Sequence, residues 1–158
     1  MPDITQKISW FDRAVISRMN RWFMPFSRFA LFVIFFWFGA LKVFGLSPAN
    51  PLVAQLLEHT MPFISFAHFI VVFGIFEVII GVLFLVKGME RLAIVFLALH
   101  MATTLMPLIL VPEATWSGFF VPTLEGQYII KNLAIIAVAM GILAHKHPYE
   151  EEKISARA

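Results

Sequence analysis

The sequence predicts an all-α integral membrane protein, built as a four-helix bundle with an amphipathic interfacial helix at its amino terminus. Of the 158 residues, 60% are hydrophobic and only 14% are charged. The mean hydropathy of +0.85 lies far outside the range of soluble globular domains. Four apolar runs are each long enough to cross a bilayer, which takes roughly 20 residues.

The amino-terminal segment, residues 1–25, is too charged to span a membrane but carries a helical repeat. Apolar side chains recur every three or four positions, at Ile4, Ile8, Phe11, Val15, Met19 and Trp22. Lys7, Arg18 and Arg21 share another face, which predicts an amphipathic helix on the cytoplasmic membrane surface. The alternative is a helix docked on a partner subunit. No small-residue cleavage site follows, so no removable signal peptide is expected.

The four predicted spans occupy residues 26–144, which we treat as one bundle domain. They cover residues 26–44, 63–86, 92–111 and 128–144. Proline and glycine residues mark the two longer connections as loops, at Pro48, Pro51, Pro62, Pro112, Gly118, Pro122 and Gly126. A tight polar turn at residues 87–91 joins the middle spans. Residues 145–158, with three consecutive glutamates at positions 150–152, are expected to form a solvated cytoplasmic tail.

Basic residues predict the orientation of the bundle. Of the twelve Lys and Arg residues, all except Lys42 and Lys131 lie on the side of the termini and of the short turn, which makes ten on one side. The positive-inside rule therefore places both termini in the cytoplasm. We expect a multi-pass protein of the bacterial inner membrane, with the two longer loops in the periplasm and the lipid bilayer as its surroundings.

Two ionisable residues are predicted to lie deep within the bundle. Glu77 and His100 fall inside the second and third spans, where an ionised group costs about 2.5–3.5 kcal/mol on insertion scales and usually faces a partner. Glu77 lies 12 positions before Met89 and His100 lies 11 positions after it. An antiparallel helical hairpin would bring the two side chains to nearly the same level, where they could touch.

Two hydroxyl groups accompany the histidine. Thr103 and Thr104 follow His100 by three and four residues and share its helix face. Pro107 frees a backbone carbonyl nearby, so the threonines could simply cap it or bend the helix. Alternatively, Glu77, His100, Thr103 and Thr104 line a pocket for a polar head group such as a quinone ring. Structural attachment between helices and a ligand pocket both remain open here.

A second group of polar residues is predicted at the periplasmic ends of the spans. Lys42, Glu125 and Lys131 could gather around an outward-facing vestibule suited to an anion or a polar head group. The simpler alternative is that each of these side chains forms a local ion pair or extends to the membrane–water interface, without forming a common site. Glu58, His59, His68, Gln127 and Asn132 belong to the same region.

Composition and spacing exclude several kinds of chemistry. The chain has no cysteine, so thiolate metal sites, iron–sulfur clusters and a dithiol mechanism within this chain are excluded. His68 and His100 lie at different depths and do not match as haem ligands, and no histidine spacing fits a closed zinc site. No metal site is therefore predicted. A net charge of +2 is too small to suggest binding to nucleic acid.

Three sequence motifs resemble the DoxX-like superfamily, especially its YkgB-type inner-membrane branch. The first is Trp37-Phe38-Gly39-Ala40-Leu41-Lys42-Val43-Phe44, and the second is Gly74-Ile75-Phe76-Glu77 with Gly81. The third and most specific motif is Glu125-Gly126-Gln127-Tyr128-Ile129-Ile130-Lys131-Asn132-Leu133. The resemblance covers roughly residues 28–143 and marks Lys42, Glu77, Glu125 and Lys131 as the family's characteristic positions.

The resemblance implies a four-helix membrane fold with both termini inside. One relative in the superfamily is a subunit of a thiosulfate:quinone oxidoreductase, and others are linked to oxidative stress. We therefore expect a subunit associated with respiratory or redox-stress chemistry that binds quinone or a similar amphipathic ligand. The alternatives are a non-catalytic subunit that assembles or stabilises a larger complex, and a small-solute or proton pathway. Other membrane subunits or further copies of the chain are the expected protein partners, and no catalytic residue is assigned.

Overall fold

The computed structural model describes residues 4–146, with side chains described for residues 10–145. It is mostly helical, as predicted, and contains four helical stretches long and apolar enough to cross a membrane. They are formed by α1 (Ile4–Val43), α3 (Phe66–Leu85), α4 (Glu90–Leu105) together with α5 (Pro107–Leu110), and α7 (Leu124–Lys146). The predicted structure of the acidic tail falls outside the described residues, as do the side chains of Ile4, Lys7 and Ile8.

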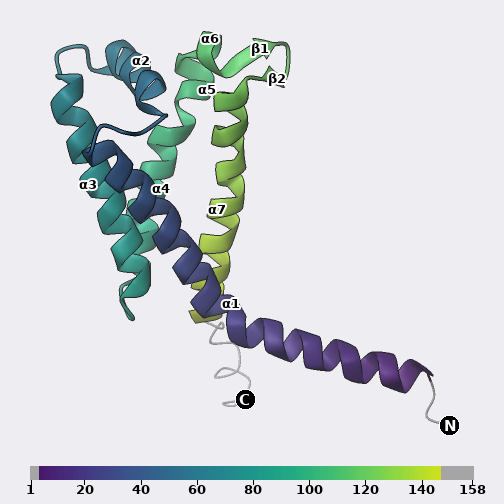
Figure 1. Cartoon of the computed structure of the whole chain (residues 1–158). Coiled ribbons are helices and arrows are strands. Elements are labelled where there is room, and N and C mark those ends of the chain that lie inside the picture. Colours follow the sequence, from purple (N-terminus) through teal and green to yellow (C-terminus); the bar gives the residue numbers. More distant parts are fainter. Residues whose placement is uncertain (1–3, 147–158) are drawn as a thin grey trace, which may run out of the picture.

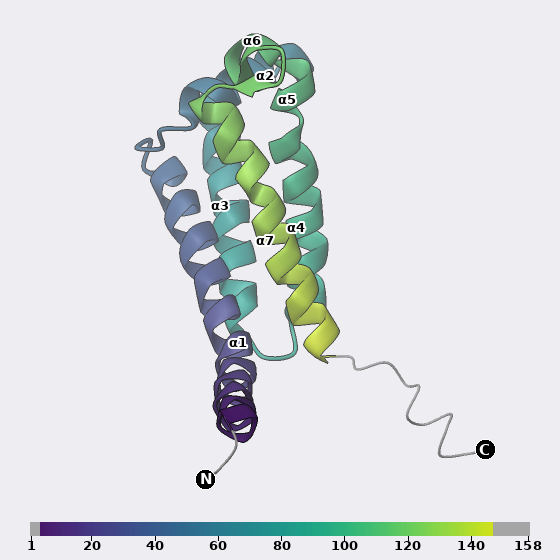
Figure 2. The same ribbon diagram turned by 90° about the vertical axis from the view of Figure 1, so that its right-hand side faces the viewer.

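The long helices stand side by side, and their connections gather at one end (Figures 1 and 2). Helix α2 (Asn50–Thr60) lies across this end together with α5, α6 (Pro112–Thr115) and the strands β1 (Trp116–Gly118) and β2 (Val121–Pro122). We call this the loop end. The amino-terminal part of α1, the last turns of α7 and the short α3–α4 turn lie at the opposite end, which we call the terminal end.

Helix α1 differs from its prediction. We expected an interfacial helix over residues 1–25 and a separate span over residues 26–44, but α1 is one helix of 40 residues with Pro25 inside it. Proline removes one hydrogen bond of the helix and bends it without ending it. Figure 1 accordingly shows an arm, residues 4–25, that projects away from the other helices. Phe11, Val15, Met19 and Trp22 are exposed along it.

The third predicted span, residues 92–111, is divided in two. Helix α4 ends at Leu105 and α5 begins at Pro107, whose nitrogen has no proton to donate to the carbonyl of Thr103. The chain then forms α6 and an antiparallel hairpin, in which Trp116 is opposite Pro122 and Gly118 is opposite Val121. The sequence analysis expected only a loop here, because strands this short carry no alternating pattern.

Helices α1 and α3 run antiparallel and pack with their backbones in contact. A Cβ atom on Gly39 would lie 2.6 Å from the carbonyl oxygen of Gly74, and one on Gly81 would lie 2.8 Å from the amide nitrogen of Phe36. Only glycine fits at these positions, as at other close helix crossings. The apolar core continues from this contact to α4 and α7 and comprises Leu31, Phe35, Ile80, Phe84, Ala93, Leu97, Met101, Ala139 and Ile142.

Candidate functional site

Three charged or titratable side chains from three different helices meet inside the bundle. The Lys42 ammonium donates to both carboxylate oxygens of Glu77, at 2.9 and 2.7 Å from Oε1 and Oε2. His100 Nε2 lies 2.7 Å from Glu77 Oε1. The three residues are only 6%, 4% and 5% exposed, respectively. Lys42, Glu77 and His100 therefore form one buried network, and the contact predicted between Glu77 and His100 is present.

The glycine contact explains why Lys42 reaches this network. Gly39 and Lys42 are three residues apart on α1, as are Gly74 and Glu77 on α3, so each glycine shares a helix face with one member of the ion pair. In an α-helix the Cα–Cβ bonds tilt toward the amino terminus. On antiparallel helices the Lys42 and Glu77 side chains therefore lean toward each other, and they meet where the backbones touch.

The histidine is fixed on both of its ring nitrogens. Thr104 Oγ1 lies 3.1 Å from His100 Nδ1 and 2.9 Å from the carbonyl oxygen of His100, while Thr103 Oγ1 donates to the same carbonyl at 2.7 Å. Both threonine hydroxyls therefore bond to groups of His100. Neither of them bonds to the Thr103 carbonyl, which Pro107 leaves without its helical donor. The imidazole ring packs against three aromatic rings, those of Phe35, Phe73 and Phe76.

The hydrogen bonds assign protons to the network. A carboxylate beside an ammonium accepts hydrogen bonds, so His100 donates from Nε2 to Glu77. In the tautomer with a proton on Nε2 alone, His100 accepts the Thr104 hydroxyl proton at Nδ1. The Thr104 hydroxyl can instead donate to the carbonyl oxygen of His100, 2.9 Å away.

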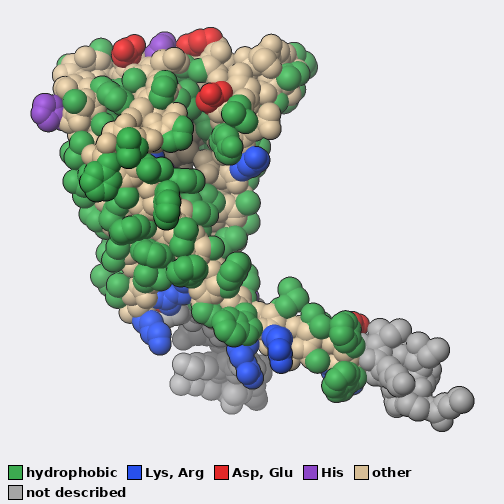
Figure 3. Space-filling view, in the orientation of Figure 1, with side chains coloured by type: hydrophobic (Ala, Val, Ile, Leu, Met, Phe, Trp, Pro, Cys, Tyr) green, Lys and Arg blue, Asp and Glu red, His purple; other side chains and the backbone are tan. Residues whose placement is uncertain are grey.

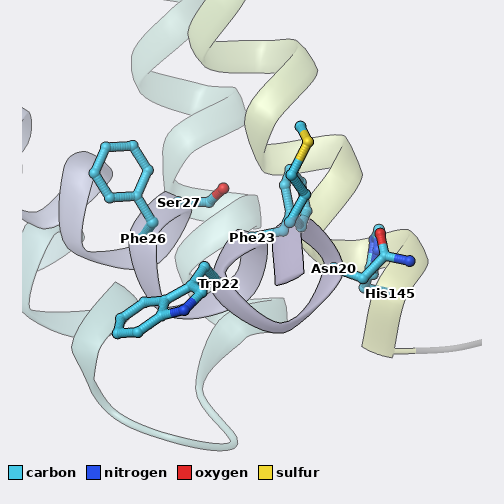
Figure 4. Close-up of a pocket in the computed structure, with 7 residues that line it drawn as sticks. Asn20, Trp22, Phe23, Phe26, Ser27 and His145 are labelled. Atoms are coloured by element: carbon cyan, nitrogen blue, oxygen red, sulfur yellow. The ribbon is translucent and has the colours of Figure 1, made fainter. Parts of the chain in front are cut away.

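Two shallow hollows in the described part of the chain lie away from this network. One lies between the α1 arm and the end of α7 and has a volume of about 350 Å³; Figure 4 shows its lining, Met19, Asn20, Trp22, Phe23, Phe26, Ser27 and His145. The rings of Phe23 and His145 stack there, with centroids 4.7 Å apart. Ser27 is 15 residues from Lys42 on α1, about 22 Å along the axis. The other hollow is in the hairpin.

The structure places the three residues of the predicted outer vestibule in different surroundings. Lys42 turns inward to Glu77, whereas Glu125 and Lys131 are exposed on α7. The Lys131 ammonium lies 4.9 Å from the centre of the Tyr128 ring on its own helix. The Lys42 ammonium instead pairs with the Glu77 carboxylate on α3. Pattern reasoning assigned Lys42 a depth in the bundle but did not identify the helix that it faces.

A second ion pair, between the partly buried Arg28 and the buried Glu90, was missed altogether. The Arg28 guanidinium pairs with the Glu90 carboxylate and also donates to the carbonyl oxygens of Phe84 and Leu85, at 2.7 and 3.1 Å. These carbonyls belong to the last turn of α3, where a cation is favourable. We counted Arg28 among the basic residues that indicate orientation. Arg28 lies two residues inside the first predicted span, and Glu90 lies in the short turn at the same end of the bundle. These two positions could have predicted the ion pair.

Among residues 4–146, no three His, Asp or Glu side chains lie close enough together to hold a metal ion. No protein-family model matches the chain, and neither a curated protein nor a solved structure is significantly similar to it. The fold and the site therefore define the class by themselves. It is a helical bundle with four potential membrane spans, held by the Lys42–Glu77–His100 network.

Proposed function

We propose that the chain is a multi-pass protein of a bacterial inner membrane, with its terminal end in the cytoplasm. The support is the combination of four apolar helices with a sided distribution of charge. In Figure 3, Lys and Arg side chains gather near the terminal end and along the α1 arm, whereas acidic side chains lie mainly at the loop end. The surface between the two ends is mostly apolar, which suits a lipid environment.

We infer that the protein is a non-catalytic membrane subunit that assembles or stabilises a larger complex, and that the buried network clamps its helices together. One observation carries this conclusion: Lys42, Glu77 and His100 satisfy one another. In residues 10–145 the only buried side-chain polar atom without a partner is Asn50 Oδ1, on α2. A network in which each of the three side chains has a hydrogen-bond partner holds α1, α3 and α4 in register.

A second candidate function is the binding of a quinone or a similar amphipathic ligand between the helices. The observation that favours it is the aromatic surround of His100, together with two half-buried threonine hydroxyls. A quinone oxygen would have to replace Glu77 as the acceptor from Lys42 or His100. The motifs that contain Lys42, Glu77 and Lys131 make the DoxX-like superfamily our proposed relationship, and respiratory or redox-stress chemistry our proposed setting.

Native mass spectrometry of gently extracted protein separates the two functions. A structural clamp predicts stoichiometric partner chains with wild type, no bound quinone, and loss of the partner chains in Glu77→Gln. Ligand binding predicts a quinone on wild type that is lost in both Glu77→Gln and His100→Ala. The exposed Glu58→Gln is the matched control, because it removes the same charge at the loop end, outside the network. Wild type that carries neither partner chains nor a quinone would exclude both functions.

A further inference from the structure

The α1 arm, residues 4–25, is exposed along most of its described length. Every side chain from Trp10 to Trp22 is exposed. The first anchored residue is Phe23, whose ring stacks on that of His145 near the end of α7, with centroids 4.7 Å apart. A Cβ atom on Gly141 would lie 2.9 Å from the Phe23 ring, so this contact is close. From Phe23 toward the amino terminus, the surface of the arm is therefore open to another molecule.

The large apolar side chains of the arm gather on one face. With about 100° between successive residues, five of the exposed ones fall within about 80° of one another around the helix. They are Phe11, Val15, Met19, Trp22 and Phe26. Trp10 and Ile16 lie off this face, and Ser17 and Asn20 lie on the opposite side. An exposed apolar face with a polar face behind it indicates a surface that binds lipid or protein.

The apolar face of the arm continues into the exposed surface of the span. Phe29 and Val33 follow Phe26 by three and seven residues and are exposed on the same side of α1. Leu31 and Phe35 lie on the other side and are buried in the core of the bundle. If the span crosses a bilayer, the side of α1 that contacts lipid is therefore the side that is apolar on the arm.

The arm runs across the other long helices at the terminal end. Figure 1 shows the arm from the side, and Figure 2 shows it nearly end-on, whereas α3, α4 and α7 appear lengthwise in both views. An arm that crosses a membrane bundle at one end runs along the membrane surface. Because the arm turns away from the other helices, its apolar face is on the inner side of the bend and points back toward the membrane.

Basic side chains border the apolar face. Arg18 lies about 20° from its edge, and Arg21 lies farther around the same side. Both are exposed, and arginine side chains in this position can reach lipid phosphates while the apolar face contacts acyl chains. The arm contains four basic residues and one acidic residue, Asp12. Its charge therefore favours an anionic membrane surface.

We propose that the arm lies in the cytoplasmic leaflet, with its apolar face among the upper acyl chains and with Arg18 and Arg21 paired to phosphates of anionic phospholipids. This inference rests on the proposed membrane placement, because only then is there a bilayer at the terminal end. The sequence left a partner subunit open as the occupant of this face. The unbroken apolar side of α1 and its basic border favour lipid, and Pro25 then marks the level at which α1 leaves the hydrocarbon.

Spin labels on introduced cysteines test the proposal, because the natural chain has no cysteine. The full chain is extracted gently and placed in nanodiscs that contain phosphatidylglycerol and phosphatidylcholine. Val15→Cys and Ser17→Cys are a matched pair, since they lie on one turn of the arm but on opposite faces. We expect the label at position 15 to relax with oxygen, which dissolves in lipid, and the label at position 17 to relax with a water-soluble nickel chelate.

A charge on the apolar face should lift the arm from the lipid. Val15→Asp replaces an apolar side chain with a charged one, so we expect the ratio of lipid-contacting to water-exposed label at Met19→Cys to fall by about tenfold. Ser17→Asp is the control, because it adds the same charge on the opposite face and should change this ratio much less. Neither aspartate variant should lower the thermal stability of the bundle, since both side chains are exposed.

Three results would overturn the position of the arm. Nickel contact at both positions 15 and 17 would place the arm in water, and equal effects of Val15→Asp and Ser17→Asp would remove the distinction between its faces. Shielding of position 15 from oxygen and nickel together would assign the face to a protein partner. Val33→Cys, on the exposed side of the span, tests the membrane placement separately. Nickel contact there would refute the span itself, and with it the proposed membrane protein.

Discussion

The Lys42 ammonium lies within 2.9 Å of both carboxylate oxygens of Glu77, although the two residues are 35 positions apart in the sequence. They come from α1 and α3, and both are buried. Breaking a buried pair leaves one charge without compensation, which typically costs about 3–5 kcal/mol. The pair therefore makes the stability of the bundle sensitive to either residue alone.

Replacing Glu77 with leucine should strongly destabilise the protein. Lys42 and His100 would both lose their acceptor, and we expect a loss of about 3–5 kcal/mol in the free energy of unfolding. Thermal unfolding in a mild detergent measures it, with the exposed Glu58→Leu as control. The double variant Lys42→Met/Glu77→Leu should be more stable than Glu77→Leu, because the buried ammonium is gone. A Glu77→Leu protein as stable as wild type would disprove the clamp.

Replacing Gly74 with alanine should separate α1 from α3. The new Cβ atom would lie 2.7 Å from the Gly39 carbonyl oxygen and 2.9 Å from the Lys42 Cβ atom. Overpacking of this kind typically costs about 1–3 kcal/mol, and the shift would also lengthen the ion pair. Gly118→Ala is the control, because its Cβ atom would meet only Val121 at 3.9 Å. Equal melting temperatures for the two variants would contradict the close contact of the helix backbones.

Replacing Arg28 with glutamine should loosen the terminal end of the bundle. The variant loses the ion pair to Glu90 and the two hydrogen bonds to α3 carbonyls. Hydrogen bonds to charged groups contribute about 1.5–3 kcal/mol, so we expect destabilisation of that size. Arg18→Gln, on the exposed arm, should change stability by less than about 0.5 kcal/mol. Arg28→Lys should recover little, since an ammonium cannot reproduce the fork of a guanidinium. Equal stability of Arg28→Gln and Arg18→Gln would contradict a stabilising contact between Arg28 and the end of α3.

The orientation can be tested with introduced cysteines, because the natural chain has none. Ser117→Cys, exposed in the hairpin, should react with a membrane-impermeant thiol reagent added to intact cells. Lys87→Cys, in the short turn at the terminal end, should react only after the inner membrane is permeabilised. The opposite pattern would reverse the proposed orientation. Labelling of both positions in intact cells would exclude a sealed membrane between them.

The sequence was sufficient to predict the four helices and the meeting of Glu77 with His100. Hydropathy sets span length, and a short turn between Glu77 and His100 leaves little freedom in their relative depth. The partner of Lys42 could not be predicted in the same way, because a long loop separates α1 from α3 and helix rotation depends on packing. Gly39, Gly74 and Gly81 determine this packing. The sequence analysis used them only as parts of the family motifs and did not predict which helix each of them contacts.

The separation of Lys42 from Glu77 along the chain also affects how the protein is made. If α1 enters the bilayer first, it brings a lysine whose counter-ion has not yet been synthesised. Translation at about 5–20 residues per second adds the 35 intervening residues in roughly 2–7 s. During that interval the insertion machinery, water or lipid phosphate has to accommodate the ammonium. In that order of events, we expect a chain truncated before Glu77 to hold α1 less stably in the membrane than a chain that includes α3.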